Sequence, residues 1–113
     1  MPDVIELARF RVDAEAEADF LATRPAMVKA VRERVPGLKE ISLVRLDDDT
    51  WVDVVTWASR ADAQRGAELA AALPEAQAWL RYVAVDVSMD LGEIIDRAGT
   101  SASPGTSSPT LAT

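Results

Sequence analysis

The chain has 113 residues, a net charge of −7 at pH 7, and neither cysteine nor histidine. This length suits one domain with its own core. The missing residue types exclude disulfides, thiolate nucleophiles, imidazole bases and the usual zinc and haem ligands, and the negative charge disfavours nucleic acid and anionic membranes as partners.

The N-terminal residues and the longest apolar runs bear on location. The start of the chain lacks the basic residues and long apolar stretch of a secretory signal. No apolar run is long enough to span a bilayer. We therefore expect a cytoplasmic protein that does not insert into membranes.

The first third of the chain is predicted to form a strand followed by a helix. Residues 4–12 are rich in β-branched and aliphatic side chains, which indicates a strand. Asp13 is a suitable N-cap for a helix over residues 14–22. Pro25 fits the first turn of a helix better than its interior, so we expect a bent or two-piece helix that Pro36 and Gly37 end.

A hairpin is predicted next. Residues 38–46 and 50–57 both read as strands, and the acidic turn Asp47-Asp48-Asp49 joins them. Three adjacent aspartates lack the spacing of a calcium loop, so we interpret them as a solvated turn.

The last third is predicted to form a helix and a final strand. Ser59 and Asp62 make a capping box before an alanine-rich helix over residues 61–73. Pro74 begins a shorter piece that reaches about Tyr82, and residues 83–89 alternate as a last strand. The small residues Ala63, Ala67, Ala70 and Ala71 allow either close helix–sheet packing or an unfilled volume for a flat ligand.

The element order gives the fold class. Strand, helix, strand, strand, helix, strand is the β-α-β-β-α-β plan of a ferredoxin-like α+β fold, an antiparallel four-stranded sheet with helices on one face. We expect this domain to span residues 1–97, and residues 98–113, rich in Gly, Ser, Thr and Pro, to be a disordered tail.

Both faces of the predicted hairpin carry apolar side chains. Trp51, Val55 and Trp57 share one face of their strand and Val52 and Val54 the other. One layer of helices covers only one face of a sheet. We therefore expect a homodimer that buries the two open faces against each other.

Five segments carry a resemblance to a known family. They read FLATRPAM at 20–27, VPGL at 35–38, WVDVVTWAS at 51–59, PEA at 74–76 and VDVSM at 85–89. Together they resemble the antibiotic biosynthesis monooxygenase family of dimeric α+β barrels, over roughly residues 4–95.

This resemblance implies a dimer with a pocket in each subunit between sheet and helices. Some members oxidise polycyclic phenols with O₂ and no metal or flavin; relatives degrade haem or act on quinols. In the cofactor-free polyketide oxygenases an Asn stands four residues before a strand Trp, with a Tyr in the next helix, and the corresponding positions here are Asp53, Trp57 and Ala63. The Trp matches, the Asn is Asp and the Tyr is missing, while the haem degraders' His has no counterpart.

Asp53 and Trp57 are the candidate catalytic residues. Asp53 lies between Trp51 and Trp57 on one strand face, where burial would raise the pKa of a carboxyl and suit it to remove a phenolic proton. The alternative is an ion pair between Asp53 and a strand arginine: Arg9, Arg11 or Arg45.

The candidate substrate-binding residues are aromatic or cationic: Trp51, Arg9, Arg45, Trp79 and Tyr82. The aromatic side chains are alternatively core or pocket wall, and the arginines sheet-edge ion-pair partners. The sequence thus predicts a cofactor-independent monooxygenase for a small aromatic or polyketide-like substrate, with no metal or other cofactor. The alternative is a non-catalytic module of the same fold for binding a hydrophobic ligand or for dimerisation.

Overall fold

The computed structural model describes residues 2–84 and 87–99. Residues 100–113 of the predicted tail 98–113, and residues 85 and 86 of the predicted last strand, lie outside the described residues. No helix in the described part is long and apolar enough to cross a membrane.

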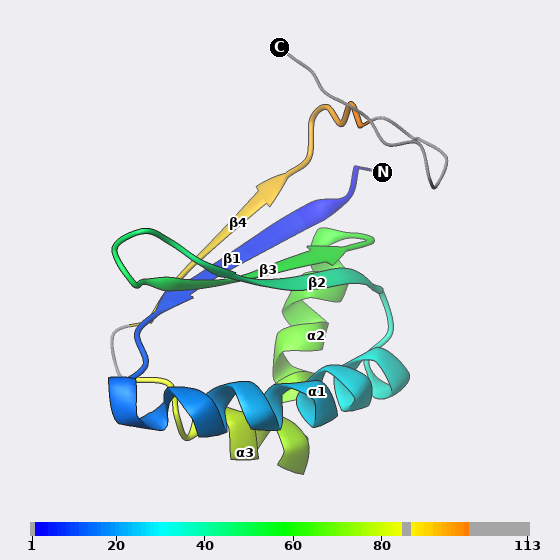
Figure 1. The fold of residues 1–113 in the computed structure, drawn as a ribbon. Helices are drawn as coiled ribbons and strands as arrows, with labels where there is room; N and C mark the ends of the chain where they lie inside the picture. Colours follow the sequence, from blue (N-terminus) through cyan, green and yellow to red (C-terminus); the bar gives the residue numbers. More distant parts are fainter. Residues whose placement is uncertain (1, 85–86, 100–113) are drawn as a thin grey trace, which may run out of the picture.

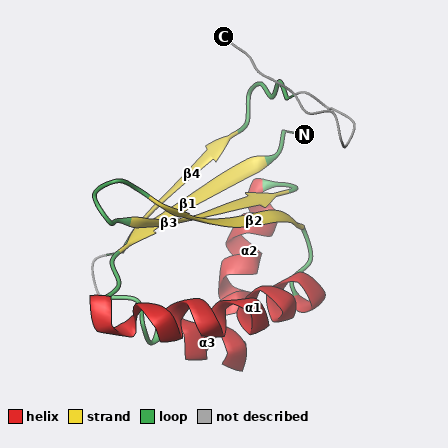
Figure 2. Ribbon diagram, viewed as in Figure 1, coloured by secondary structure: helices red, strands yellow, loops and turns green. Residues whose placement is uncertain are grey.

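A four-stranded antiparallel sheet forms one layer and the helices form the other (Figures 1 and 2). The strands are β1 (Val4–Phe10), β2 (Leu38–Arg45), β3 (Trp51–Trp57) and β4 (Ser88–Glu93), in the spatial order β2-β3-β1-β4. The helices are α1 (Glu17–Arg34), α2 (Arg60–Ala71) and α3 (Pro74–Leu80), with a short 3₁₀ turn, Ala14–Ala16, before α1. The predicted ferredoxin-like α+β fold is confirmed.

Helix α1 is continuous, so of the predicted bent or two-piece helix the two-piece alternative was wrong. Pro25 lies inside it and has no N–H for the carbonyl of Leu21. Two residues before Pro25, the Thr23 hydroxyl donates to the carbonyls of Asp19 at 3.0 Å and Phe20 at 3.1 Å. The apolar residues before and after Pro25 pack on one core, because Phe20, Met27 and Val31 are all buried. Tertiary packing therefore outweighs the local cost of the proline.

The hairpin and the second helix begin where the sequence indicated. In the turn, Asp48 Oδ1 accepts a hydrogen bond from the Thr50 backbone N–H at 3.0 Å, and Asp49 adopts a φ of 66°. Ser59 Oγ accepts a hydrogen bond from the Asp62 N–H at 3.1 Å and caps α2. Asp13 occupies the N-cap position of the 3₁₀ turn without a side-chain hydrogen bond.

Strand β4 begins five residues later than the predicted start at 83. Antiparallel pairing with β1 sets Glu93 opposite Val4 and Ser88 opposite Arg9. Val83 instead closes the end of α3 through a hydrogen bond from its N–H to the Leu80 carbonyl and packs against the core. Val83 therefore belongs to the end of α3, and the pairing of β4 with β1 begins at Ser88.

The core lies between the sheet and the helices and is rich in aromatic rings. Phe20 is fully buried at its centre, with its ring centroid 5.1 Å from those of Trp51 and Trp79 and 5.8 Å from that of Phe10. Edge-to-face and stacked contacts of this kind add to the stabilisation from burial. This cluster fixes one end of the sheet against α1 and α3.

The other face of the sheet carries no helix in the described part of the chain (Figure 1). The strand registers place Ile5, Leu7, Val52, Val54 and Val44 on it. Val44 is 38% exposed there. The same registers also place Arg9, Ser42, Thr56 and Asp90 on this face. Its apolar residues are what the prediction of a sheet-to-sheet homodimer requires.

Candidate functional site

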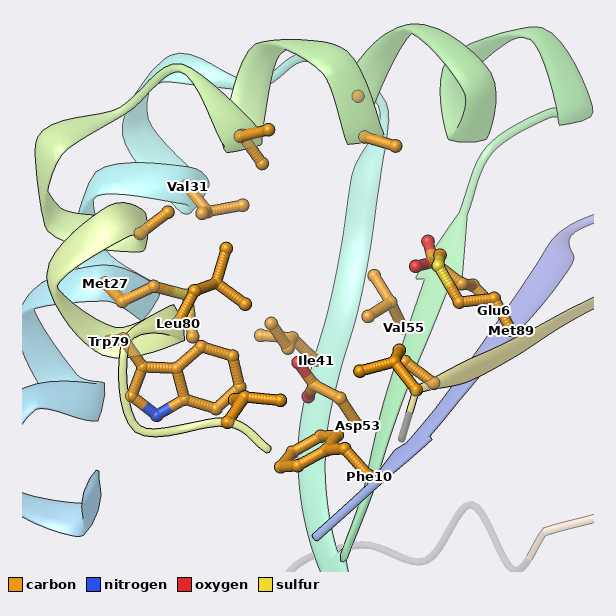
Figure 3. A pocket seen from close by; sticks show the side chains of 18 of the residues that line it. Glu6, Phe10, Met27, Val31, Ile41, Asp53, Val55, Trp79, Leu80 and Met89 are labelled. Carbon is orange, nitrogen blue, oxygen red and sulfur yellow. The ribbon is translucent and has the colours of Figure 1, made fainter. Parts of the chain in front are cut away.

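A cavity of about 250 Å³ lies between the helix-covered face of the sheet and the helices (Figure 3). Small side chains of α2 leave this space open, because Gly66, Ala67, Ala70 and Ala71 all line it. Two carboxyl groups, Glu6 and Asp53, also line the cavity. The remaining lining residues are apolar or aromatic: Ala8, Phe10, Met27, Val31, Ile41, Val55, Trp57, Ala76, Trp79, Leu80, Val83, Val87 and Met89. An apolar pocket with a few polar groups is the usual form of a small-molecule site.

Asp53 forms a largely buried ion pair with Arg24 of α1. Arg24 Nη2 donates to Asp53 Oδ1 at 2.8 Å, and the two side chains are 11% and 12% exposed. Burial raises the pKa of Asp53, and the hydrogen bond and charge of Arg24 oppose that rise. The ion pair expected for Asp53 exists, but its partner is a helix residue and not Arg9, Arg11 or Arg45.

Glu6 is the second carboxyl of the cavity. It is 8% exposed, and its Oε1 accepts a hydrogen bond from the Trp57 indole Nε1 at 2.9 Å. Burial raises the pKa of Glu6, the indole hydrogen bond opposes the rise, and the charge of Asp53 adds to it. Glu6 lies opposite Val55 and Asp53 opposite Ala8 on the paired strands, so the two carboxyls are diagonal neighbours on one sheet face.

Trp57 is held from two sides. Its indole N–H is tied to Glu6, and its ring lies against Gly66 of α2, where a Cβ would come within 2.2 Å of the ring carbon Cη2. Only glycine leaves room for this ring position. The cavity wall formed by Trp57 is therefore fixed by a hydrogen bond and by close packing.

Trp79 forms the opposite wall, from α3. The Arg24 guanidinium lies 5.2 Å from the centre of its ring, within the range of a cation–π interaction. Its buried Nε1 has no hydrogen-bond partner among the described residues. The α1 cation thus contacts both Asp53 and Trp79.

The other residues proposed from the sequence do not line the cavity. Trp51 lies against Phe20 in the core, and the Arg45 guanidinium is 4.5 Å from the Trp51 ring centre and pairs with Glu17. Arg9 is exposed, and its register opposite Val52 places it on the helix-free face. Tyr82 is partly buried against the core.

Two residues of the site were missed from the sequence, although both had a signal. Glu6 alternates with Val4, Ala8 and Phe10 on the inward face of its strand, where a carboxyl is unexpected. Arg24 falls on the helical stripe of Phe20, Met27 and Val31, so its side chain had to point inward. In each case the indication was a charged residue at a position where the repeat of the helix or strand otherwise places apolar side chains.

The described residues contain no cluster of three or more acidic side chains that could hold a metal ion.

Comparison with known proteins identifies relatives at the level of family and fold. The family model described as antibiotic biosynthesis monooxygenase matches residues 3–81. The cofactor-independent oxygenase SnoaB from Streptomyces nogalater is 23% identical with a TM-score of 0.61, over 90% of this chain and 100% of that one. Rv0793 from Mycobacterium tuberculosis is 19% identical with a TM-score of 0.65, over 86% and 99% of the two chains. No curated protein sequence matches the chain.

Proposed function

The chain belongs to the antibiotic biosynthesis monooxygenase family, and from that membership we propose that it is a cofactor-independent monooxygenase acting on an aromatic or polyketide-like molecule. The observation that carries the proposal is the apolar cavity, which is lined by a buried carboxyl, Asp53, and by the indoles of Trp57 and Trp79. SnoaB, a cofactor-independent oxygenase, has the same fold, which is consistent with O₂ chemistry in this cavity.

Asp53 is the proposed base. Removing a proton from a phenol or an activated carbon leaves an electron-rich anion, which can pass an electron to O₂ without a metal or flavin. Burial raises the pKa of Asp53 and so strengthens it as a base, while the hydrogen bond and charge of Arg24 favour its ionised form. Because Arg24 bonds to Oδ1, Oδ2 is the oxygen that would face the substrate.

Trp57 and Trp79 are the proposed walls for a flat substrate. The two indoles come from opposite layers, β3 and α3, and the small side chains of α2 leave the space between them open. We propose that the functional unit is a homodimer joined through the helix-free sheet face, which carries Leu7, Val44 and Val54.

A second candidate function has one observation in its favour. The Arg24–Asp53 ion pair can stabilise the fold without any reaction, and the cavity could then serve only to bind a hydrophobic ligand. A measurement of turnover separates the oxygenase from the ligand-binding module, because both functions predict that a ligand binds in the cavity.

The test combines oxygen consumption with ligand binding. The purified protein would be mixed with a panel of anthrones, naphthoquinols and flavonoids, and dissolved O₂ would be followed together with indole fluorescence. Substrate-dependent O₂ uptake supports the oxygenase. Binding without uptake by any compound favours the ligand-binding module.

The tryptophan variants locate the bound compound. Trp57→Phe should remove much of the fluorescence quenching, because Trp57 lines the cavity. Trp51→Phe is the matched control, since Trp51 lies outside the cavity lining and should leave the quenching in place. Equal loss of quenching in both variants would contradict binding at this site.

A further inference from the structure

Glu6 differs from Asp53 because its carboxyl has no cationic partner among the described residues. Both carboxyls are 8% exposed and line the same cavity. Asp53 has Arg24 at 2.8 Å, whereas no Arg or Lys within the described residues forms an ion pair with Glu6. The only hydrogen bond to Glu6 from the described residues comes from the neutral indole of Trp57.

The surroundings of Glu6 favour its uncharged form. Every other lining residue from α1, α2, α3, β2 and β4 is uncharged, so among the described lining residues Asp53, with its partner Arg24, is the other ionisable group. A buried anion without a cation is costly, and a second anion on the same sheet face adds repulsion. Two carboxyls in unequal settings take separate proton states: the one beside the cation ionises first.

The indole hydrogen bond also sets where a proton on Glu6 resides. A protonated carboxyl accepts hydrogen bonds at its carbonyl oxygen and donates from the other oxygen. Trp57 donates to Oε1, which leaves Oε2 to carry the proton. Figure 3 shows the Glu6 and Asp53 side chains reaching into the cavity from neighbouring strands.

We propose that Glu6 is the proton donor of this site, a carboxylic acid that presents its O–H to the oxygen atoms of the bound molecule. The proposal rests on the proposed oxygenase function and adds a residue that takes no part in the first proton abstraction. It divides the chemistry between a base held ionised by Arg24 and an acid held neutral by burial.

The two carboxyls complete a balanced cycle on a substrate with an activated CH₂ group. Asp53 takes one C–H proton, and the carbanion and O₂ form a C–O bond through one-electron transfer and radical recombination. Glu6 protonates the outer oxygen of the resulting peroxide anion.

The second half of the cycle restores both groups. The Glu6 carboxylate removes the remaining C–H proton, the C–H electron pair forms the C=O bond, and the O–O bond breaks. The departing hydroxide takes the proton from Asp53 and leaves as water. The substrate CH₂ and O₂ thus become C=O and H₂O, with two electrons of the substrate carbon reducing each oxygen atom, and both carboxyls return to their first states.

The proton state can be measured without a substrate. Infrared difference spectroscopy at neutral pH should show the C=O stretch of a protonated carboxylic acid in the wild-type protein, and Glu6→Gln should remove it. Gln offers an amide oxygen to the Trp57 N–H, so this variant keeps the acceptor. Glu40→Gln, an exposed change on β2, is the matched control and should leave the band unchanged. A wild-type spectrum without this band overturns the proposal.

The kinetic role is measured with a compound that the wild-type protein oxygenates. Glu6→Gln should lower kcat about 100-fold with little change in KM, the usual scale for losing a positioned acid. The variant should also release peroxide. In the wild type kcat should fall as the pH rises and Glu6 loses its proton, and in Glu6→Gln this fall in kcat should be absent. Unchanged kcat, no peroxide and an unchanged pH profile would overturn the proton-donor role.

The two arms separate this inference from the proposed function. A wild-type protein that oxygenates a substrate but lacks the infrared band contradicts only the role of Glu6. If the wild-type protein shows the infrared band but consumes no O₂ with any compound of the panel, the result contradicts the proposed oxygenase function. The same result supports the neutral state of Glu6.

Discussion

The ring of Trp57 lies directly against Gly66, and a Cβ added to that glycine would be 2.2 Å from Cη2 and 2.4 Å from Cζ3 of the indole. Helix α2 therefore approaches the sheet as closely as an indole ring allows. The position of Trp57 in the cavity depends on this single missing methyl group.

Gly66→Ala should displace the Trp57 ring and reduce ligand binding. Overpacking of a core position costs about 1–3 kcal/mol, which should appear as a lower free energy of unfolding in urea titrations. Gly92→Ala is the control, because a Cβ added to Gly92 would lie 3.9 Å from its nearest neighbour, Ile5 Cγ2, an ordinary van der Waals distance. Unaltered Trp57 fluorescence and binding in Gly66→Ala would show that the helix moves away instead.

Asp53→Asn should affect both turnover and stability. Without the carboxylate, Arg24 remains as a largely buried charge, and we expect the free energy of unfolding to fall by about 2 kcal/mol. If Asp53 is the base, turnover should also fall about 100-fold or more. Full turnover on a proven substrate would end the base hypothesis.

Glu17→Gln is the matched control for that variant. It breaks the Arg45–Glu17 pair, whose side chains are 45% and 36% exposed. Exposed pairs contribute little because water and salt screen them. We expect both turnover and stability to stay near wild type.

The raised pKa of Glu6 predicts how stability depends on pH. Since the folded protein holds the Glu6 proton more tightly than the unfolded chain, the free energy of unfolding falls as pH rises from the unfolded pKa toward the folded one. The slope from one such group is at most about 1.4 kcal/mol per pH unit. Urea titrations of Glu6→Gln should lack this decline and match wild type below the unfolded pKa. If the free energy of unfolding of the two proteins changed with pH in the same way, the predicted contribution of Glu6 would be contradicted.

The helix-free sheet face predicts an obligate dimer. Sedimentation at micromolar concentration should give one dimeric species, and Val54→Lys, at the centre of that face, should give a folded monomer. Leu69→Lys on α2 is the control, because Leu69 is already 40% exposed. A wild-type monomer with native circular dichroism would contradict the sheet-to-sheet arrangement.

The sequence predicted the elements that rest on strong local signals. The hairpin turn at Asp48, the capping box at Ser59 and the order of strands and helices along the chain follow from residue type and period alone. The predictions of a two-piece helix at Pro25 and of a strand starting at residue 83 were wrong, because tertiary contacts decide both. Core packing holds α1 together, and the pairing with β1 begins at residue 88.

The site was only partly predictable for the same kind of reason. Asp53 and Trp57 share a strand face, which a period of two reveals. Their partners Arg24 and Glu6 come from other elements, 29 and 51 positions away along the chain. Which cation meets Asp53 depends on how α1 crosses the sheet, and a linear pattern does not contain that information.

The Arg24–Asp53 pair also bears on how the family can vary. In the polyketide oxygenases that this chain resembles, an Asn stands at the position of Asp53, and an amide needs no cation to balance it. A lone guanidinium in an apolar site would be costly beside an amide, just as a lone carboxylate would be without Arg24. Positions 24 and 53 should therefore covary among relatives: an acid at 53 should accompany a base at 24, and an amide at 53 an uncharged residue at 24.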